Sequence, residues 1–247
     1  MELKVLWLFD NLMDLYGDRG NIQVLKERCA RRGIDCTVDT YRLGDDKKCS
    51  DYDIVFMGGG ADHEQNLLYE DLLGLKDDIA YSFGKGTQYL LICGGYQLFG
   101  QYYLDQDGIR LDGLGLYDYY TEATTDRNNR CIGNIAVEVT IDGESFKAVG
   151  FENHGGQTRN VASPLGRTLS GHGNTADSGY EGFVTDNVIG TYMHGPLLPK
   201  NPRIADILIK RALRRKYGTD ELAPLDDTLE NKARNAMLKR LGVQPDG

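Results

Sequence analysis

Short apolar runs alternate with helical patterns through the first half of the chain, and this alternation restricts its fold more than any other feature. Four runs have the length and composition of buried strands: Leu3–Phe9, Cys36–Tyr41, Asp53–Met57 and Tyr89–Ile92. Between them, apolar residues at helical spacing indicate three helices: Asn21–Arg32, Leu67–Phe83 and Gly95–Tyr103. This order predicts an α/β fold with a doubly wound, mostly parallel sheet.

The second half of the chain begins with shorter strand-like stretches joined by tight turns. These stretches are Gly115–Ala123, Asn134–Ile141 and Phe146–Phe151. Asp142-Gly143 lies between the last two and is typical of a hairpin turn. The pattern therefore predicts an antiparallel extension of the sheet.

The last part of the chain returns to longer elements. Val188–Met193 indicates one more strand, and amphipathic helices are predicted over Ile204–Tyr217 and Thr228–Leu241. No internal repeat, low-complexity tract or linker interrupts the 247 residues. We therefore expect a single domain spanning residues 1–247, with C-terminal helices from about residue 203.

Composition and charge argue against several classes of function. The formal net charge is −9 and no basic stretch offsets it, which argues against a nucleic-acid partner. No apolar run approaches the length of a membrane span, and Met1–Phe9 is too short for a signal peptide and carries an acid at position 2. The five cysteines are odd in number and lack C-x-x-C spacing. Neither a disulfide framework nor a zinc site is predicted, and a reducing cytoplasm is expected.

One cysteine stands where a strand is predicted to turn sharply into a helix. The apolar run Tyr89–Ile92 ends in Cys93, and Gly94 and Gly95 follow at once. Such a turn pushes a nucleophile out of the sheet and aims a helix N-terminus at it, which favours the thiolate. A free cysteine is more often a buried core residue. The flanking glycines nevertheless favour a nucleophile at Cys93, and Gln97 lies one helical turn further on, where it can face the same pocket.

Gly58-Gly59-Gly60 and His194 follow two other predicted strands. The carboxyl ends of parallel strands meet at one edge of a sheet, where ligands collect. Glycine amides at that edge can donate to an oxyanion, with the amide of Gly94 as a second donor. His194 is a candidate base for the thiol proton and a candidate acid for the leaving group. The remaining histidines, which lack a second feature and are interpreted as structural or solvated, are His63, His154 and His172.

These motifs resemble class I, or triad-type, glutamine amidotransferase domains over nearly the whole chain. The segments that carry the resemblance are Ile92–Gln97, Phe151–Gly156, Gly190–Asn201 and, in support, Gly58–Gln65. The first and third are specific to the cobyric acid synthase-like branch of that class. In cobyric acid synthases this domain is fused to a synthetase. The standalone length and Phe151–Gly156 make the chain most similar to the GatD family, the small subunits of lipid II isoglutaminyl synthases.

The resemblance implies roles for individual residues. Cys93 matches the nucleophile and His194 the catalytic histidine. Gly59 or Gly60, with Gly94, matches the oxyanion region, and Gln97 matches a pocket-lining glutamine. The family holds the α-carboxylate of glutamine with an arginine. Arg130 fits that pattern best, and Arg127 is the alternative because a three-residue insertion leaves the alignment ambiguous.

Two positions depart from the class I pattern. Leu91 stands where a glycine usually precedes the cysteine, so a slightly looser elbow is expected. Pro196 stands where a glutamate usually follows the histidine, so the third member of the triad is missing from its usual place. We hypothesise that a carboxylate of the partner subunit completes the triad. Glu152 and Glu181 stay open as alternatives within the chain.

The resemblance also implies a function in peptidoglycan biosynthesis, namely hydrolysis of L-glutamine through a cysteinyl thioester. Ammonia is expected to pass to a MurT-like, Mur-ligase-family subunit of a heterodimer, which amidates the α-carboxyl of D-glutamate in the lipid II stem peptide. The chain has neither a phosphate-binding glycine motif nor metal-ligand spacing. No cofactor is therefore expected in it, and ATP and magnesium are expected on the partner.

Three alternatives differ in the acceptor or in the chemistry. The chain would be the glutaminase component of a cobyrinate or cobyrate amidation system if corrin precursors took the ammonia. It would be a non-catalytic binding subunit of the same fold if Cys93 were inert. A cysteine peptidase or hydrolase on a related fold is the third alternative.

Overall fold

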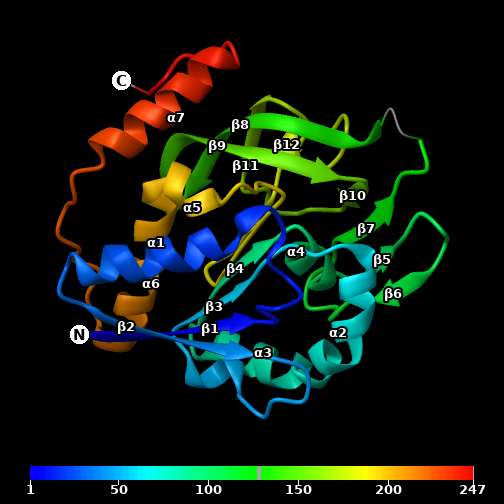
Figure 1. The fold of residues 1–247 in the computed structure, drawn as a ribbon, viewed down its shortest axis with the longest axis horizontal. Helices are drawn as coiled ribbons and strands as arrows, with labels where there is room; N and C mark the ends of the chain where they lie inside the picture. The colour runs from blue at the N-terminus through cyan, green and yellow to red at the C-terminus, as the bar shows by residue number, and fades with distance from the viewer. Residues whose placement is uncertain (127–128, 247) are drawn as a thin grey trace.

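A six-stranded sheet forms the centre of the computed structural model, which describes residues 1–126 and 129–246 (Figure 1). Its strands are β1 (Glu2–Leu8), β2 (Asp35–Tyr41), β3 (Ile54–Met57), β4 (Gln88–Ile92), β13 (Phe183–Val184) and β14 (Val188–Thr191). They lie in the order β13-β14-β4-β3-β1-β2. All neighbours are parallel except β13, which runs antiparallel to β14 at one edge. This arrangement confirms the predicted mostly parallel sheet.

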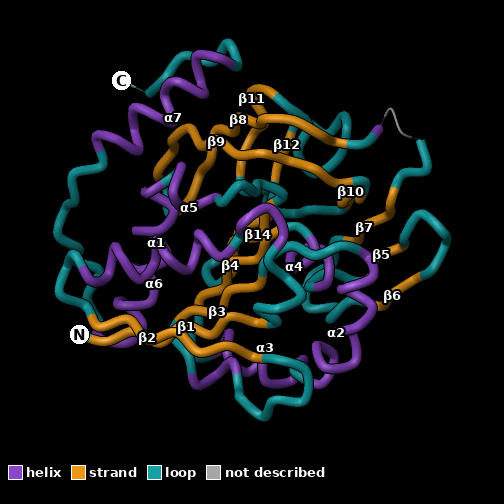
Figure 2. The backbone as a smooth tube through the Cα atoms, in the orientation of Figure 1, coloured by secondary structure: helices purple, strands orange, loops and turns teal. Residues whose placement is uncertain are grey.

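Helices cover both faces of this sheet (Figures 1 and 2). They are α1 (Arg19–Ala30), α2 (Asp62–Gly74), α3 (Lys76–Gly84), α4 (Gly94–Leu98), α5 (Leu197–Lys200), α6 (Pro202–Tyr217) and α7 (Thr228–Arg240). Short 3-10 helices are formed by Leu15–Gly17 and Cys49–Asp51. Because the β1-to-β2 and β3-to-β4 connections run in opposite directions along the sheet, right-handed crossovers place α1 on one face and α2 and α3 on the other.

The strands of the second half form two further four-stranded sheets. One contains β5 (Tyr102–Leu104), β6 (Arg110–Asp112), β7 (Tyr120–Ala123) and β10 (Gly156–Arg159). The other contains β8 (Cys131–Ile141), β9 (Glu144–His154), β11 (Gly166–Ser170) and β12 (Tyr180–Glu181). Asp142 and Gly143 join β8 to β9 with positive φ angles of 53° and 79°, as the favoured two-residue hairpin turn requires.

Two predicted helices differ from the structure. The helix predicted over Leu67–Phe83 is divided into α2 and α3, which meet at Leu75 after the weak helix former Gly74. The helix predicted over Gly95–Tyr103 ends at Leu98, and the chain then enters β5. Gly100 lies so close to Tyr119 that a Cβ there would be 2.4 Å from the Tyr119 carbonyl oxygen. Continuing the helix would therefore lose this backbone packing.

The buried core explains why the central strands were visible as apolar runs. Every residue of β3 and β4 is buried, because helices cover both faces of these strands. A smaller apolar cluster, in which Leu238 of α7 joins Ala136 and Val149, fixes the C-terminal helix on the β8–β9 sheet. No described helix combines the length and apolar character that a bilayer crossing needs.

Candidate active site

Cys93 sits on a sharp turn between β4 and α4. Its backbone has φ 50° and ψ −105°, a conformation that a residue with a side chain rarely adopts. The Cys93 N–H donates to the carbonyl of Thr191 on β14, at 2.8 Å, and only 6% of the residue is exposed. A Cβ on Gly95 would lie 2.8 Å from the Met57 carbonyl oxygen, so glycine is required where the elbow passes the end of β3.

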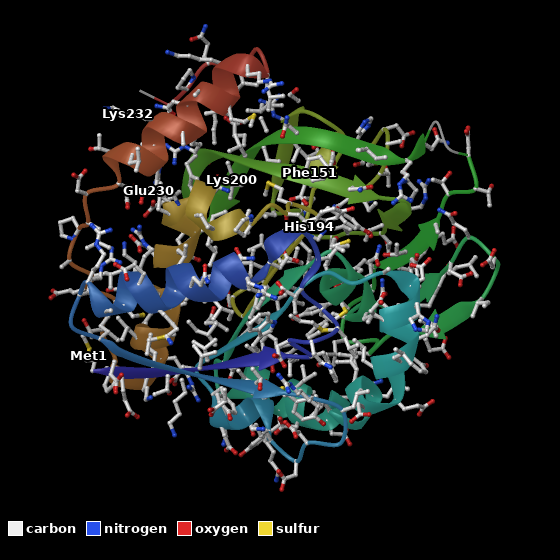
Figure 3. The ribbon with its side chains drawn as sticks, viewed as in Figure 1. Met1, Phe151, His194, Lys200, Glu230 and Lys232 are labelled. Carbon is white, nitrogen blue, oxygen red and sulfur yellow. The ribbon has the colours of Figure 1, made fainter. Side chains whose placement is uncertain are left out.

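His194 follows β14 and lies fully buried beside the elbow. Its backbone forms an isolated bridge with Phe151 of β9, with N–H···O distances of 2.7 and 3.1 Å, and Figure 3 shows the two residues together. A methyl group on Gly59 would be 2.5 Å from His194 Cε1 and 3.3 Å from Cys93 Cβ. The glycine triplet, the cysteine and the histidine therefore meet at one point, as the sequence predicts.

Asp18 holds the other side of the imidazole. Its Oδ2 lies 3.2 Å from His194 Nδ1, and both side chains are fully buried. The same oxygen accepts the Gly59 N–H at 2.8 Å. His194 Nε2 has no hydrogen-bond partner among the described residues and is the nitrogen left for Cys93. Cysteine, histidine and carboxylate of this chain thus lie next to one another.

A carboxylate of this chain therefore lies where the sequence-based hypothesis placed one from the partner subunit, with Glu152 and Glu181 as the alternatives within the chain. Neither Glu152 nor Glu181 takes this place. Glu152 accepts the N–H groups of His172 and Gly173, at 2.8 and 2.9 Å. Glu181 accepts the Thr191 hydroxyl and the Tyr192 N–H. Asp18 could not be predicted from the sequence as a site residue because it lies 176 residues from His194, in a loop without apolar periodicity. The one sequence feature that points to Asp18 is its position after β1, at the edge of the sheet where Cys93 and His194 also lie.

The surroundings of His194 favour its protonated form. Burial lowers the pKa of the imidazole, but the charge of Cys93 and the hydrogen bond to Asp18 outweigh it and raise the pKa to about 10. Tyr16 covers the ring edge-to-face, with centroids 5.2 Å apart. The site therefore holds a proton on the histidine next to the cysteine sulfur.

The glycine triplet is engaged differently from the expectation. The N–H of Gly59 points at Asp18 and is not free for an oxyanion, so Gly59 is corrected from a donor to a residue that fixes the triad. The N–H groups of Gly60 and Gly94 have no acceptor among the described residues. Met13 packs against both glycines, since a Cβ on Gly60 would lie 2.4 Å from its sulfur and one on Gly94 3.0 Å from its Cε.

A cavity of about 280 Å³ opens at Cys93. Gln97, which is 3% exposed, lines it and donates from Nε2 to the Tyr192 hydroxyl at 3.2 Å. Arg130 lies at its mouth, where Nη2 donates to Asn153 Oδ1 at 3.1 Å. The alternative arginine, Arg127, lies outside the described residues. The cavity thus joins the cysteine to the arginine that the sequence favours.

The other histidines have structural surroundings. His154 lines the cavity wall, where it stacks on Tyr192 with ring centroids 3.6 Å apart and burial lowers its pKa. His172 lies in a loop and approaches the Ala176 carbonyl, and His63 is exposed on α2. Among the described residues, no group of three or more histidine, cysteine or acidic side chains is placed to bind a metal ion.

Comparison with known proteins agrees with this geometry. The subunit GatD of lipid II isoglutaminyl synthase (glutamine-hydrolyzing) from Streptococcus pneumoniae is 41% identical over 94% of this chain and 88% of its own length. The Staphylococcus aureus protein of the same name is 37% identical over 98% of both chains. A probable cobyric acid synthase from Methanothermobacter thermautotrophicus is 29% identical over 89% of this chain but only 46% of its own.

A solved structure described as a glutamine amidotransferase has the same fold. It superposes with a TM-score of 0.51 at 15% identity, covering 84% of this chain and 98% of the other. Residues 4–202 match the family described as the CobB/CobQ-like glutamine amidotransferase domain. This match covers most of the chain, from the first strand to the start of α6. The chain therefore belongs to the family of CobB/CobQ-like glutamine amidotransferase domains.

Proposed function

We propose that this chain is the glutaminase subunit of a lipid II isoglutaminyl synthase. The observation that carries the proposal is the strained Cys93 elbow beside His194, whose Nδ1 is held by the buried Asp18. The two relatives that match almost end to end are named as GatD subunits of that enzyme, which supports this acceptor over a corrin. The chain spans less than half of the cobyric acid synthase relative, which argues against that alternative.

The geometry supports hydrolysis in two steps. Cys93 Sγ, whose proton is held by His194 Nε2, attacks the side-chain amide carbon of L-glutamine as a thiolate. The N–H groups of Gly60 and Gly94 donate to the tetrahedral oxyanion. The C–N bond then breaks, His194 returns the proton to the departing ammonia, and a γ-glutamyl thioester remains. Water activated by His194 adds to this thioester and releases glutamate and the free thiol.

Asp18 and Arg130 have supporting roles in this scheme. Asp18 accepts the Nδ1 proton of His194, which orients the ring and stabilises its charged form. Arg130 pairs with the α-carboxylate of glutamine at the mouth of the cavity. Gln97 shapes the wall behind the nucleophile.

The product ammonia passes to a partner subunit in this proposal. We infer a MurT-like ligase of the Mur family, acting in the cytoplasm, which binds ATP and magnesium and amidates the α-carboxyl of D-glutamate in lipid II. The sequence has no phosphate-binding glycine motif, in agreement with this division of labour. Because Asp18 already holds His194, activation by the partner has to act through something other than a supplied carboxylate.

The proposal is tested by assaying glutamine hydrolysis and lipid II amidation with and without the ligase subunit. Cys93→Ala is expected to abolish both reactions with glutamine while leaving amidation supported by free ammonium intact. Cys36→Ala, a half-buried cysteine outside the cavity, is the matched control. An active Cys93→Ala protein would exclude the covalent route. Amidation of a corrin precursor in place of lipid II would support the alternative acceptor.

A further inference from the structure

Two side chains of opposite charge line the active-site cavity. Among the described residues that line it, Arg130 carries the permanent positive charge and Asp62 the carboxylate. The two do not form an ion pair with each other. Arg130 is held by Asn153, at 3.1 Å, and Asp62 by the Tyr103 hydroxyl, at 2.9 Å. Each charge is thus positioned by a neutral partner and stays available to a ligand.

Asp62 lines the cavity that opens at Cys93, and it is exposed to solvent. It is the first residue of α2 and directly follows the glycine triplet and Ala61. Its partner Tyr103 comes from β5 and is 4% exposed. Burial raises the pKa of Tyr103, and the charges of Asp62 and Cys93 raise it further. The Tyr103 hydroxyl therefore binds the Asp62 carboxylate and is close enough to Cys93 to be affected by its charge.

L-Glutamine carries an ammonium and a carboxylate on the same carbon, at the opposite end from the amide that reacts. We propose that Asp62 binds the α-ammonium of glutamine while Arg130 binds its α-carboxylate. Asp62 then selects the free amino acid over amides that lack the α-amine. This inference rests on the proposed glutaminase function and assigns the ammonium site within it. A hydrogen bond between an ammonium and a carboxylate is among the stronger polar contacts.

Asp62 also has a purely structural explanation, because a carboxylate in the first turn stabilises a helix. Glutaramate separates the two roles, since it is glutamine without the α-amine and keeps the carboxylate and the amide. The experiment measures kcat/KM for L-glutamine and for glutaramate in the wild-type complex and in Asp62→Asn. The same two compounds are titrated calorimetrically into the Cys93→Ala full chain with and without Asp62→Asn.

Asp62→Asn is expected to lower kcat/KM for glutamine by about 10- to 100-fold, the loss typical of a hydrogen bond to a charged group. The same change should leave glutaramate within about twofold, because no ammonium is present to lose its partner. Equal losses for both compounds would assign Asp62 a structural role, and no loss for glutamine would remove it from the site; either result overturns the inference.

Two further variants make the result specific. Glu64→Gln removes a charge from the same helix turn, outside the cavity, and is expected to change neither substrate. Asp62→Glu keeps the charge and is expected to retain discrimination between the substrates even if Asp62→Asn proves unstable in a thermal melt. A wild-type complex that hydrolyses no glutamine contradicts the proposed function itself. Normal hydrolysis without a selective Asp62 effect contradicts only this inference.

Discussion

The backbone of Cys93 shows how a single residue is prepared for its role. A side chain at φ 50° and ψ −105° costs on the order of 1–3 kcal/mol, which the surrounding structure has to supply. It does so through the Thr191 carbonyl, which fixes the Cys93 N–H, and through Gly95, which packs on the end of β3. Leu91, two residues earlier, is accommodated without loss of this conformation. The sharp turn at Cys93 therefore forms even though Leu91 replaces the glycine of the class I pattern.

Asp18→Asn tests the carboxylate at the same scale. An amide keeps the shape and can still accept the Gly59 N–H, but it removes the charge that holds protonated His194. We expect kcat for glutamine hydrolysis to fall by about 10²- to 10⁴-fold, with a small change in KM. Asp10→Asn is the control, because Asp10 lies in the same loop but pairs with Arg42 at the surface. Unchanged kcat in Asp18→Asn would return the third triad position to the partner subunit.

The protonation of His194 gives a second prediction at this scale. In the wild type, Cys93 and Asp18 overcome the effect of burial, so the ring keeps its proton until the pH approaches 10. Cys93→Ala removes one raising contribution and leaves burial in place. The ring should then lose its proton at a lower pH. The shift of the His194 Cε1 signal with pH, followed by NMR, measures this. Cys36→Ala should leave the titration unchanged, and an unaltered curve in Cys93→Ala would contradict the coupling.

At the scale of elements, the loop between β1 and α1 organises the site. Within ten residues it supplies four contacts. Met13 packs against Gly60 and Gly94, and the Leu15 N–H donates to the Gly59 carbonyl. Tyr16 packs against the His194 ring, and Asp18 contacts its Nδ1. This loop has no strand or helix periodicity, and these contacts are with residues 41 to 178 positions away in the sequence. Sequence patterns report local structure, so they identified the partners at the strand ends and missed the loop that joins them.

Gly59→Ala tests how tightly this junction is packed. A methyl group there would lie 2.5 Å from His194 Cε1 and 3.3 Å from Cys93 Cβ, and the buried ring has little room to move. We expect a loss of stability of about 1–3 kcal/mol and loss of most glutaminase activity. Gly74→Ala, at the end of α2, meets nothing within 4 Å and should be neutral or stabilising by about 0.4–1 kcal/mol. Urea denaturation and steady-state rates distinguish the two, and an active, stable Gly59→Ala protein would contradict the packing.

At the scale of the whole molecule, the strands that could be predicted from the sequence are the ones buried on both faces. Strands β3 and β4 are covered on both faces, so their sequences are uninterrupted apolar runs, and Cys93 and Gly58–Gly60 were correctly placed at their ends. Strands such as β6 (Arg-Leu-Asp) and β10 (Gly-Gln-Thr-Arg) are short and polar. They exist because neighbouring strands offer backbone partners, a tertiary effect that no local pattern records. The two additional sheets could be anticipated only as an antiparallel extension.

The C-terminal segment is tied to the amidotransferase fold by an ion-pair network around Arg28 of α1. Its guanidinium contacts Asp206 of α6 at 2.7 Å and Asp227, just before α7, at 2.6 Å. The arginine side chain is 5% exposed, and the carboxylates are 22% and 18% exposed. The network therefore links the first helix to both C-terminal helices across nearly the full length of the chain.

Arg28→Ala should weaken this connection without altering catalysis. Removing the arginine leaves two partly buried carboxylates facing each other, although Arg32 still pairs with Asp206. We expect the free energy of unfolding to fall by about 2–4 kcal/mol, since a broken buried pair costs more than the pair contributes. Arg28 is roughly 15 Å along α1 from Asp18, so kcat should stay within about twofold below the melting temperature. Arg167→Ala breaks an exposed pair with Glu138 and should cost less than about 0.5 kcal/mol. Equal losses for the two variants in guanidinium denaturation would show that the Arg28 network does not hold the C-terminal helices.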